Sequence, residues 1–371
     1  MHLHRPLKWR IYAALFSFVG AFAFTGCKEK ASSSAAAVPK QHPGPVEHID
    51  TDERLQAARL EASVDPIDRE IKIFRAEVRG AFDENRFDFL EEKAQALRKS
   101  KELFGNGSWK IFQFYQGIDN RFHTGDDGWL TDLRRLEKWK KAHPDSITAR
   151  IALAQFWVGY GWKARGSGYA DTVTEERWAV FGERLKQAMA ALDEAKRISD
   201  TDPCWYAVGL QLALGTGAPP EDFDALVKGA VAIEPTFWGI DTQRAYSLLP
   251  RWYGKPGDWV KYADSVAKRE GGLGEEGYAR VVIHMADFYA DVFRDGKASW
   301  SVTKAGLATL RKKYPKSLEI LSQTARLACM GRDRMTAKEA FEELGDTYLE
   351  GVWGKPERFV HFRTWARTGQ W

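Results

Sequence analysis

Apolar residues recur every three or four positions along most of the chain after residue 50, which is the spacing of one face of an α-helix. In the segment EIKIFRAEVRGAF, the residues on this face are Ile71, Phe74, Val78 and Phe82. In the longer segment ERWAVFGERLKQAMAALDEAKRI, they are Phe181, Leu185, Ala188, Leu192 and Ala195. Strand-like alternation is scarce, and Gly and Pro fall between the periodic segments. The pattern therefore predicts an all-α fold.

Four prolines each follow one amphipathic segment and precede the next: Pro144, Pro203, Pro235 and Pro315. This arrangement resembles the tetratricopeptide repeat, a unit of ~34 residues in which small residues let two helices approach closely. The positions that match the repeat are Leu153, Ala154, Leu212, Ala213, Ala230, Ala337 and Phe341. The prolines are 59, 32 and 80 residues apart, and no unit carries the whole pattern. We therefore expect a degenerate tetratricopeptide-like array of helix pairs, an α-solenoid or superhelix.

The first 26 residues have the pattern of a secretory signal. A basic head with Arg5, Lys8 and Arg10 precedes an apolar run of 14 residues, shorter than the ~20 that a membrane-spanning helix needs. The run ends in FTGC, which resembles the bacterial lipobox, although Phe24 stands where Leu is usual. This resemblance implies a lipoprotein signal peptide over residues 1–26 and a fatty acid such as palmitate on Cys27. The alternatives are an ordinary signal peptide cleaved elsewhere and an uncleaved anchor.

The segment after Cys27 is rich in Ser, Ala and Pro and has no apolar period, so residues 27–50 are expected to form a flexible tether. Residues 51–371 then form the helical domain. A lipid anchor followed by a tether predicts a protein of the bacterial cell envelope, held to the membrane through Cys27. Lys28, in place of Asp, favours the outer membrane, facing the periplasm, by resemblance to enterobacterial sorting rules.

The charge of the chain is less basic than it first looks. The 371 residues contain 55 Lys and Arg and 51 Asp and Glu, a net charge of +4. Removing residues 1–26, which hold three basic and no acidic residues, leaves a net charge of +1. A mature chain with so little excess charge gives no support to a nucleic-acid partner.

The residue types that hold metals are sparse and scattered. Beyond Cys27 only Cys204 and Cys329 remain, and each lies in an apolar helical stretch. They form either one disulfide or two buried free thiols. The histidines of the folded part have no metal-ligand spacing: His123, His143, His284 and His361. We therefore predict no metal site and no cofactor.

One short motif occurs twice, as YGKPGDW from Tyr253 and as WGKPERF from Trp353. Gly permits a turn and Pro suits the first position of a helix, so each copy predicts a helix start. A motif that appears twice is better explained as a structural device than as one active site. Arg251 and Trp252, just before the first copy, have no counterpart in the second and are therefore candidate binding residues.

A second candidate is the interruption WKARGSGYADTV, which separates two long amphipathic segments. Insertions in helical-repeat arrays often lie on the binding face. Arg165, Tyr169 and Asp171 are the candidate ligand-binding residues here, and two glycines beside Arg165 could present N–H groups to an anion. The alternative is an exposed loop in which Arg165 and Asp171 pair with each other.

The segments FWVGYGWKARGSGYADTV, AIEPTFW and LLPRWYGKPGDW on a lipobox-bearing chain resemble a bacterial family called domain of unknown function 4034, over about residues 70–350. The resemblance implies an envelope setting and a repeat-like fold, but no activity. No nucleophile elbow and no catalytic residues can be assigned. We expect a binding or scaffold module for a protein or peptide. The alternative is an envelope enzyme, such as a hydrolase, that uses the Arg165–Asp171 loop with Arg251 and Trp252.

Overall fold

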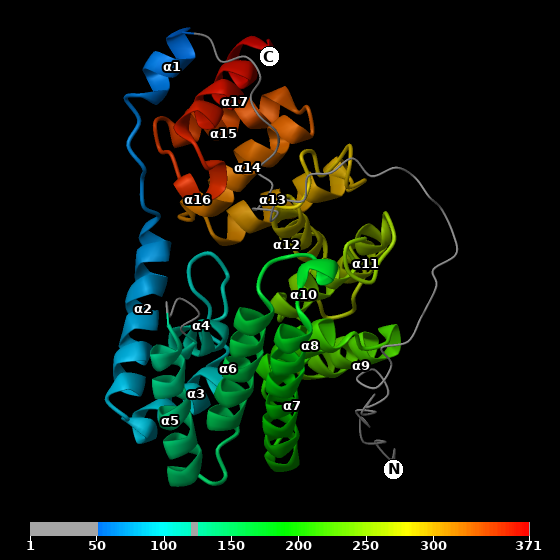
Figure 1. Cartoon of the computed structure of the whole chain (residues 1–371). Helices are drawn as coiled ribbons and strands as arrows, with labels where there is room; N and C mark the ends of the chain where they lie inside the picture. The colour runs from blue at the N-terminus through cyan, green and yellow to red at the C-terminus, as the bar shows by residue number, and fades with distance from the viewer. Residues whose placement is uncertain (1–50, 120–124, 371) are drawn as a thin grey trace, which may run out of the picture. The chain divides into compact units, whose positions relative to one another are not determined.

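A computed structural model describes residues 51–119 and 125–370 (Figure 1). Within these residues the backbone forms seventeen α-helices, one short 3-10 helix and no strand, with two isolated β-bridges. The all-α prediction is therefore confirmed for this part of the chain. The predicted signal peptide (1–26), the tether (27–50), lipidated Cys27 and His123 lie outside the described residues. No described helix has both the length and the apolar character that crossing a membrane requires.

The helices follow one another through short connections. Their bounds are α1 (Thr51–Ala57), α2 (Pro66–Asp83), α3 (Phe87–Ser100), α4 (Lys110–Ile118), α5 (Asp126–Ala142), α6 (Ile147–Arg165), α7 (Glu175–Ile198), α8 (Pro203–Thr216), α9 (Pro220–Ile233), α10 (Gly239–Ser247), α11 (Asp258–Ala267), α12 (Glu275–Met285), α13 (Trp300–Lys313), α14 (Leu318–Met330), α15 (Arg334–Leu344), α16 (Glu350–Trp353) and α17 (Pro356–Thr368). The 3-10 helix, η2, spans Ala170–Thr172 between α6 and α7.

Consecutive helices pair as hairpins, and the four prolines mark where hairpins begin. α6 packs on α7, α8 on α9, α10 on α11, α12 on α13 and α14 on α15. Pro144, Pro203, Pro235 and Pro315 precede or begin the first helix of four of these pairs. The remaining pair, α12 and α13, begins instead after Gly274, which has a positive φ of 61°. The 80 residues between the last two prolines therefore span two hairpins, which explains the irregular spacing.

The repeat-like positions lie in the interior, as the repeat pattern requires. Ala154 on α6, Ala213 on α8, Ala230 on α9 and Ala337 on α15 are buried, and so is Phe341 on α15. Small residues at these places allow neighbouring helices to approach closely, which is the role they have in helical repeats. The helical-repeat character is therefore consistent with the structure. The winding of the hairpins into a superhelix stays a prediction.

The predicted apolar faces are the buried faces of their helices. All five predicted residues of α7 are buried: Phe181, Leu185, Ala188, Leu192 and Ala195. On α2, Ile71, Val78 and Phe82 are buried, whereas Phe74 is only partly covered and packs edge-on against Phe104, with ring centroids 5.4 Å apart. Periodicity alone therefore identified the core-facing side of both helices.

Several tryptophans form the centres of the packed regions and find partners for their N–H groups. The indole of Trp205 donates to the carbonyl oxygen of Leu192 at 2.8 Å, and Trp139 donates to Glu91 at 2.8 Å. Trp259 donates to the phenol oxygen of Tyr289 at 3.0 Å. A buried indole is stable in a core because its ring packs while its N–H is satisfied.

The two copies of the repeated motif differ in where their helices begin. In the second copy Pro356 is the first residue of α17, as predicted. In the first copy Gly257 has a φ of 88°, and α11 begins only at Asp258. The Asp258 carboxylate instead accepts a hydrogen bond from the backbone N–H of Lys255 at 2.8 Å. The prediction that Pro begins the helix in both copies is therefore wrong for the first, because a left-handed glycine follows its proline.

Cys204 and Cys329 are free and buried, so the structure has the second of the two alternatives left open for them. Burial raises the pKa of both thiols well above the ordinary value. Such thiols are poor nucleophiles, because the reactive form is the thiolate.

Candidate functional site

The interrupting loop holds Arg165 in place by its own backbone. α6 ends at Arg165, and Gly166 caps it with a φ of 78°, a conformation that suits glycine. The Arg165 guanidinium donates to the carbonyl oxygens of Gly166 at 3.1 Å and Gly168 at 3.0 Å. It also lies over the rings of Trp162 and Trp178, 5.3 and 5.2 Å from their centroids. These contacts give Arg165 a role in fixing the loop.

The other candidates of the loop do not converge with Arg165. The side chains of Tyr169 and Asp171 are exposed. No ion pair joins Arg165 to Asp171 in the part of the chain that the structure describes. The alternative pairing of Arg165 with Asp171 is therefore not formed among the described residues, and binding of an anion by this loop stays a prediction.

Arg251 and Trp252 lie in the loop between α10 and α11, which is closely tied to its neighbours. The phenol of Tyr253 donates to the carbonyl oxygen of Leu214 on α8 at 2.6 Å. The Arg251 guanidinium donates to the phenol oxygen of Tyr246 at 2.7 Å. It lies over the rings of Tyr246, Trp252 and Phe288, at 5.0, 5.9 and 5.1 Å from their centroids. Arg251 is thus an exposed cation that rests on an aromatic cluster.

This cluster lines a pocket of about 460 Å³ between α6, α8, α10 and α12. Pockets of about 300–1,000 Å³ are typical of small-ligand sites in proteins. The lining residues are Trp162, Leu210, Gln211, Leu214, Thr242, Gln243, Tyr246, Trp252, His284 and Phe288. Neighbouring rings meet mostly at an angle, with centroids 6.0 Å apart for Trp162 and Trp252 and 5.1 Å apart for Tyr246 and Phe288. Half of the lining residues are therefore aromatic, and four helices contribute to the wall.

Two polar atoms of the pocket residues are buried without a hydrogen-bond partner. One is the amide oxygen of Gln243, an acceptor, and the other is the indole N–H of Trp252, a donor. Leaving such a group unpaired costs about 1–3 kcal/mol in a folded protein. A ligand recovers this free energy only if its own donor and acceptor reach these two shielded atoms. Another polar side chain of the lining, Thr242, already donates to the carbonyl oxygen of Gly239 at 3.0 Å.

The structure brings together two of the five predicted binding residues, Arg251 and Trp252, and adds others that the sequence did not single out. Trp162 was visible in the interrupting motif, but its partners were not. His284 had been set aside because it lacks metal-ligand spacing. The sequence does place His284 within the apolar segment of α12. A polar side chain in such a segment is uncommon and can indicate a functional position. Gln243 and Tyr246 gave no signal in the sequence.

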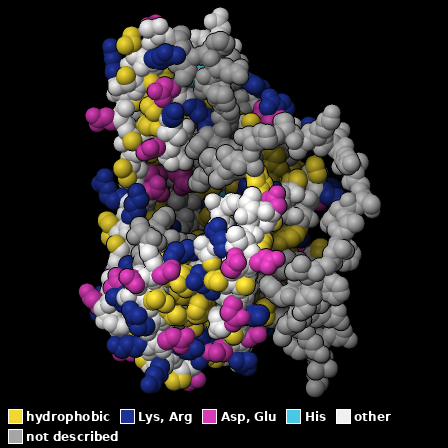
Figure 2. All heavy atoms as spheres, viewed as in Figure 1, with side chains coloured by type: hydrophobic (Ala, Val, Ile, Leu, Met, Phe, Trp, Pro, Cys, Tyr) yellow, Lys and Arg dark blue, Asp and Glu magenta, His cyan; other side chains and the backbone are white. Residues whose placement is uncertain are grey.

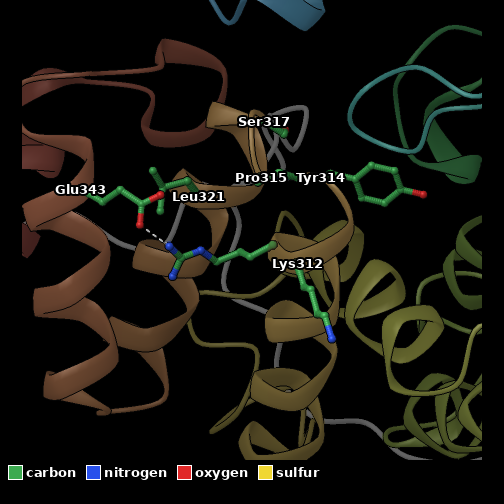
Figure 3. Close-up of a pocket in the computed structure, with 7 residues that line it drawn as sticks. Lys312, Tyr314, Pro315, Ser317, Leu321 and Glu343 are labelled. Carbon is green, nitrogen blue, oxygen red and sulfur yellow. Dashed lines mark hydrogen bonds and ion pairs between the residues drawn. The ribbon is translucent and has the colours of Figure 1, made fainter.

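A second, smaller pocket of about 270 Å³ lies where α13 leads into α14 (Figure 3). Its guanidinium, from Arg311, is already paired with the carboxylate of Glu343 on α15. Lys312 and Tyr314 point away from this pair in Figure 3. The charged groups of this pocket satisfy one another or face elsewhere, so the aromatic pocket is the stronger candidate.

The face drawn in Figure 2 has no large patch of one charge, because Lys and Arg side chains are interspersed there with Asp and Glu. Many of these charges form pairs at the surface, such as Lys93 with Glu77 at 3.0 Å. Exposed pairs of this kind contribute only about 0–1 kcal/mol each. This face therefore gives no support to recognition by a patch of a single charge.

Comparison with known proteins identifies part of the chain. Residues 74–212 match the family model described as a domain of unknown function, DUF4034. The match is shorter than the 70–350 that the resemblance suggested; it reaches into α8 and includes Trp162, Leu210 and Gln211 of the pocket. No curated protein and no solved structure matches the chain. Over residues 74–212 the chain is therefore similar to the domain of unknown function DUF4034.

Proposed function

We propose that this protein is a binding module that holds an apolar side chain of a partner peptide or protein in the aromatic pocket. The observation that carries this proposal is an aromatic-walled pocket of about 460 Å³ in which two lining residues, Gln243 and Trp252, each have a buried polar atom without a partner. Apolar walls with a few placed polar groups are typical of sites that bind organic ligands. A peptide supplies such groups, because each backbone unit carries one N–H and one carbonyl.

Arg251 extends the pocket at its rim. Its guanidinium is exposed, rests on three rings and carries a charge at every physiological pH. A carboxylate of the ligand, either an acidic side chain or a chain terminus, would pair with it while the apolar group enters the pocket. Because Arg251 is exposed, such a pair would contribute about 0–1 kcal/mol, which is at most roughly a fivefold change in affinity.

The pocket chemistry supports binding better than hydrolysis. Among the described residues that line it, the titratable groups are the imidazole of His284 and the phenol of Tyr246, and there is no carboxylate, amine or thiol. General acid–base hydrolysis needs a positioned acid and base near the same bond. Arg165, which the enzyme alternative would use, is held by the carbonyl oxygens of its own loop.

We further propose that the module is held in the bacterial envelope by a lipid on Cys27. The support is the sequence: a basic head, a short apolar run, FTGC and a tether over residues 27–50. Cys27→Ser should abolish incorporation of labelled palmitate into the protein in growing cells. If the wild-type chain incorporates none, the anchor is refuted, whereas the pocket proposal is unaffected.

The pocket is tested with short peptides that end in Phe, Trp or Leu, each with a free or an amidated terminus, by quenching of tryptophan fluorescence. Gln243→Leu and Trp252→Phe remove the unpaired acceptor and donor while keeping the apolar wall. We expect both variants to melt no lower than the wild type and to bind at least tenfold more weakly. Arg251→Ala should weaken only the peptides with a free carboxylate.

Tyr169→Ala is the matched control, because it removes an exposed aromatic residue that does not line the pocket. Its binding should equal that of the wild type. The proposal is refuted if no peptide binds. It is also refuted if Gln243→Leu and Trp252→Phe bind as tightly as the wild type per folded molecule.

A further inference from the structure

Arg358 is a buried cation without a counter-ion. It lies in the first turn of α17 and is 5% exposed. None of its three guanidinium nitrogens has a hydrogen-bond partner within the described chain. Its guanidinium carbon lies 5.5 Å from the centroid of the Phe362 ring. Arg363 on the same helix is equally buried, yet it donates to Gly345 at 3.0 Å and to Asp346 at 2.7 Å.

A second buried arginine faces the same region. Arg326 on α14 is 1% exposed, and it donates to the carboxylate of Asp287 at 3.2 Å and to the carbonyl oxygen of Ala286 at 2.9 Å. Its Nε is buried without an acceptor. α14 packs on α17, with the thiol of Cys329 3.9 Å from the carbonyl oxygen of Phe362. Burial, and then the charge of Arg326, lower the pKa of Arg358 to about 9, against the opposing effect of Asp287.

The charges of this cluster do not balance. Arg326 and Arg358 are two cations, and Asp287 is their one anion, so a charge of +1 remains in a poorly hydrated place. The adjacent Glu357 forms no ion pair with either arginine among the described residues, and its buried Oε2 has no hydrogen-bond partner. No side chain caps the N-terminus of α17, and the positive end of the helix adds to the same potential. Buried guanidinium groups are normally paired, because an isolated buried charge is costly.

We propose that Arg326 and Arg358 form a recognition site for a single carboxylate group that enters beside Asp287. One monoanion brings the charge of the cluster to zero, whereas a dianion such as phosphate would reverse it. A carboxylate also matches the two parallel N–H groups of a guanidinium. Asp287, 31% exposed at its side chain, is the member of the cluster that reaches solvent. The site is separate from the proposed peptide pocket, although Phe288, the next residue, lines that pocket.

The site is tested on the full chain in mild detergent, with acetate as the probe and chloride at equal ionic strength as the reference. The unfolding temperature of the wild type should rise by at least about 2 °C in acetate, and this rise should saturate as the acetate concentration increases. Phosphate should raise it less. Arg358→Met should abolish the response to acetate, whereas Arg363→Gln should keep it, since it leaves the cluster intact.

Two further measurements test the proposal. The first asks which molecule supplies the carboxylate, and the second asks whether the charge of the cluster sets the preference. N-acetylalanine and its amide test whether the site is open to the carboxyl end of a peptide. If it is, N-acetylalanine should raise the unfolding temperature and its amide should not. If the site admits only a small free acid such as acetate, neither compound should raise it. Asp287→Asn raises the charge of the cluster to +2, so the preference should move from acetate to phosphate. The proposal is overturned if the wild type does not respond to acetate, if Arg358→Met responds as the wild type does, or if Asp287→Asn leaves the preference unchanged.

Discussion

The carboxylate of Asp241 should be one of the most costly side chains in the molecule to neutralise. It lies on α10 beside Thr242 and Gln243 of the pocket and is 2% exposed. One of its oxygens accepts from the phenol of Tyr262 at 2.7 Å and from Arg269 at 2.6 Å. The other accepts from Arg269 at 2.9 Å. These contacts join α10 to Tyr262 on α11 and to Arg269, two residues after the end of that helix.

Asp241→Asn keeps the shape of the side chain and removes its charge. The guanidinium of Arg269, 13% exposed, then stays buried without its counter-ion. Removing one partner of a buried ion pair costs about 3–5 kcal/mol, so we expect a loss of that size. Tyr262→Phe removes only one neutral donor to the same carboxylate and should cost about 1 kcal/mol. A much larger loss of stability for Asp241→Asn than for Tyr262→Phe would therefore show that the charge of Asp241, and not a single hydrogen bond, accounts for most of the stabilisation.

The assay is urea unfolding at pH 7, followed by tryptophan fluorescence, with the free energy taken from the midpoint and slope. The double variant Asp241→Asn with Arg269→Met removes both charges. It should be less destabilised than the sum of the two single variants, since no unpaired ion remains. The reasoning is wrong if Asp241→Asn costs no more than Tyr262→Phe, or if the two single losses simply add.

Two other changes test the packing and the surface electrostatics. Gly306→Ala should lower stability by about 1–3 kcal/mol, because the added Cβ would collide with the carbonyl oxygen of Glu275 where α13 meets α12; Gly351→Ala, which meets nothing within 4 Å, should be neutral in the same unfolding assay. Burial raises the pKa of Asp333, but hydrogen bonds, above all from Lys304, outweigh it and lower the pKa to about 2. Its stabilisation is therefore present above pH 4 and lost as the pH falls toward 2, and Asp333→Asn should flatten this part of the profile of stability against pH.

The sequence by itself determined the fold class, the helix pairs and which side of the long helices is buried. The apolar spacing that ends at Leu192 and Ala195 is a local property of the chain, and it is read without knowing any neighbour. Small residues such as Ala154 and Ala213 likewise show where two helices can approach closely. The sequence also distinguished Arg251 and Trp252 from the repeated motif that follows them, because a comparison of the two copies needs no tertiary information.

Only the tertiary structure decided what those residues meet. The pocket gathers Trp162, Gln243, Trp252 and His284 from segments spread over more than a hundred residues, and their meeting depends on how the hairpins pack. Arg165 belongs to the same region, yet its guanidinium has turned to the carbonyl oxygens of its own loop. Helical periodicity records which face of a helix avoids water. It does not record which face of another helix covers it, because that depends on side-chain packing between elements far apart in the chain.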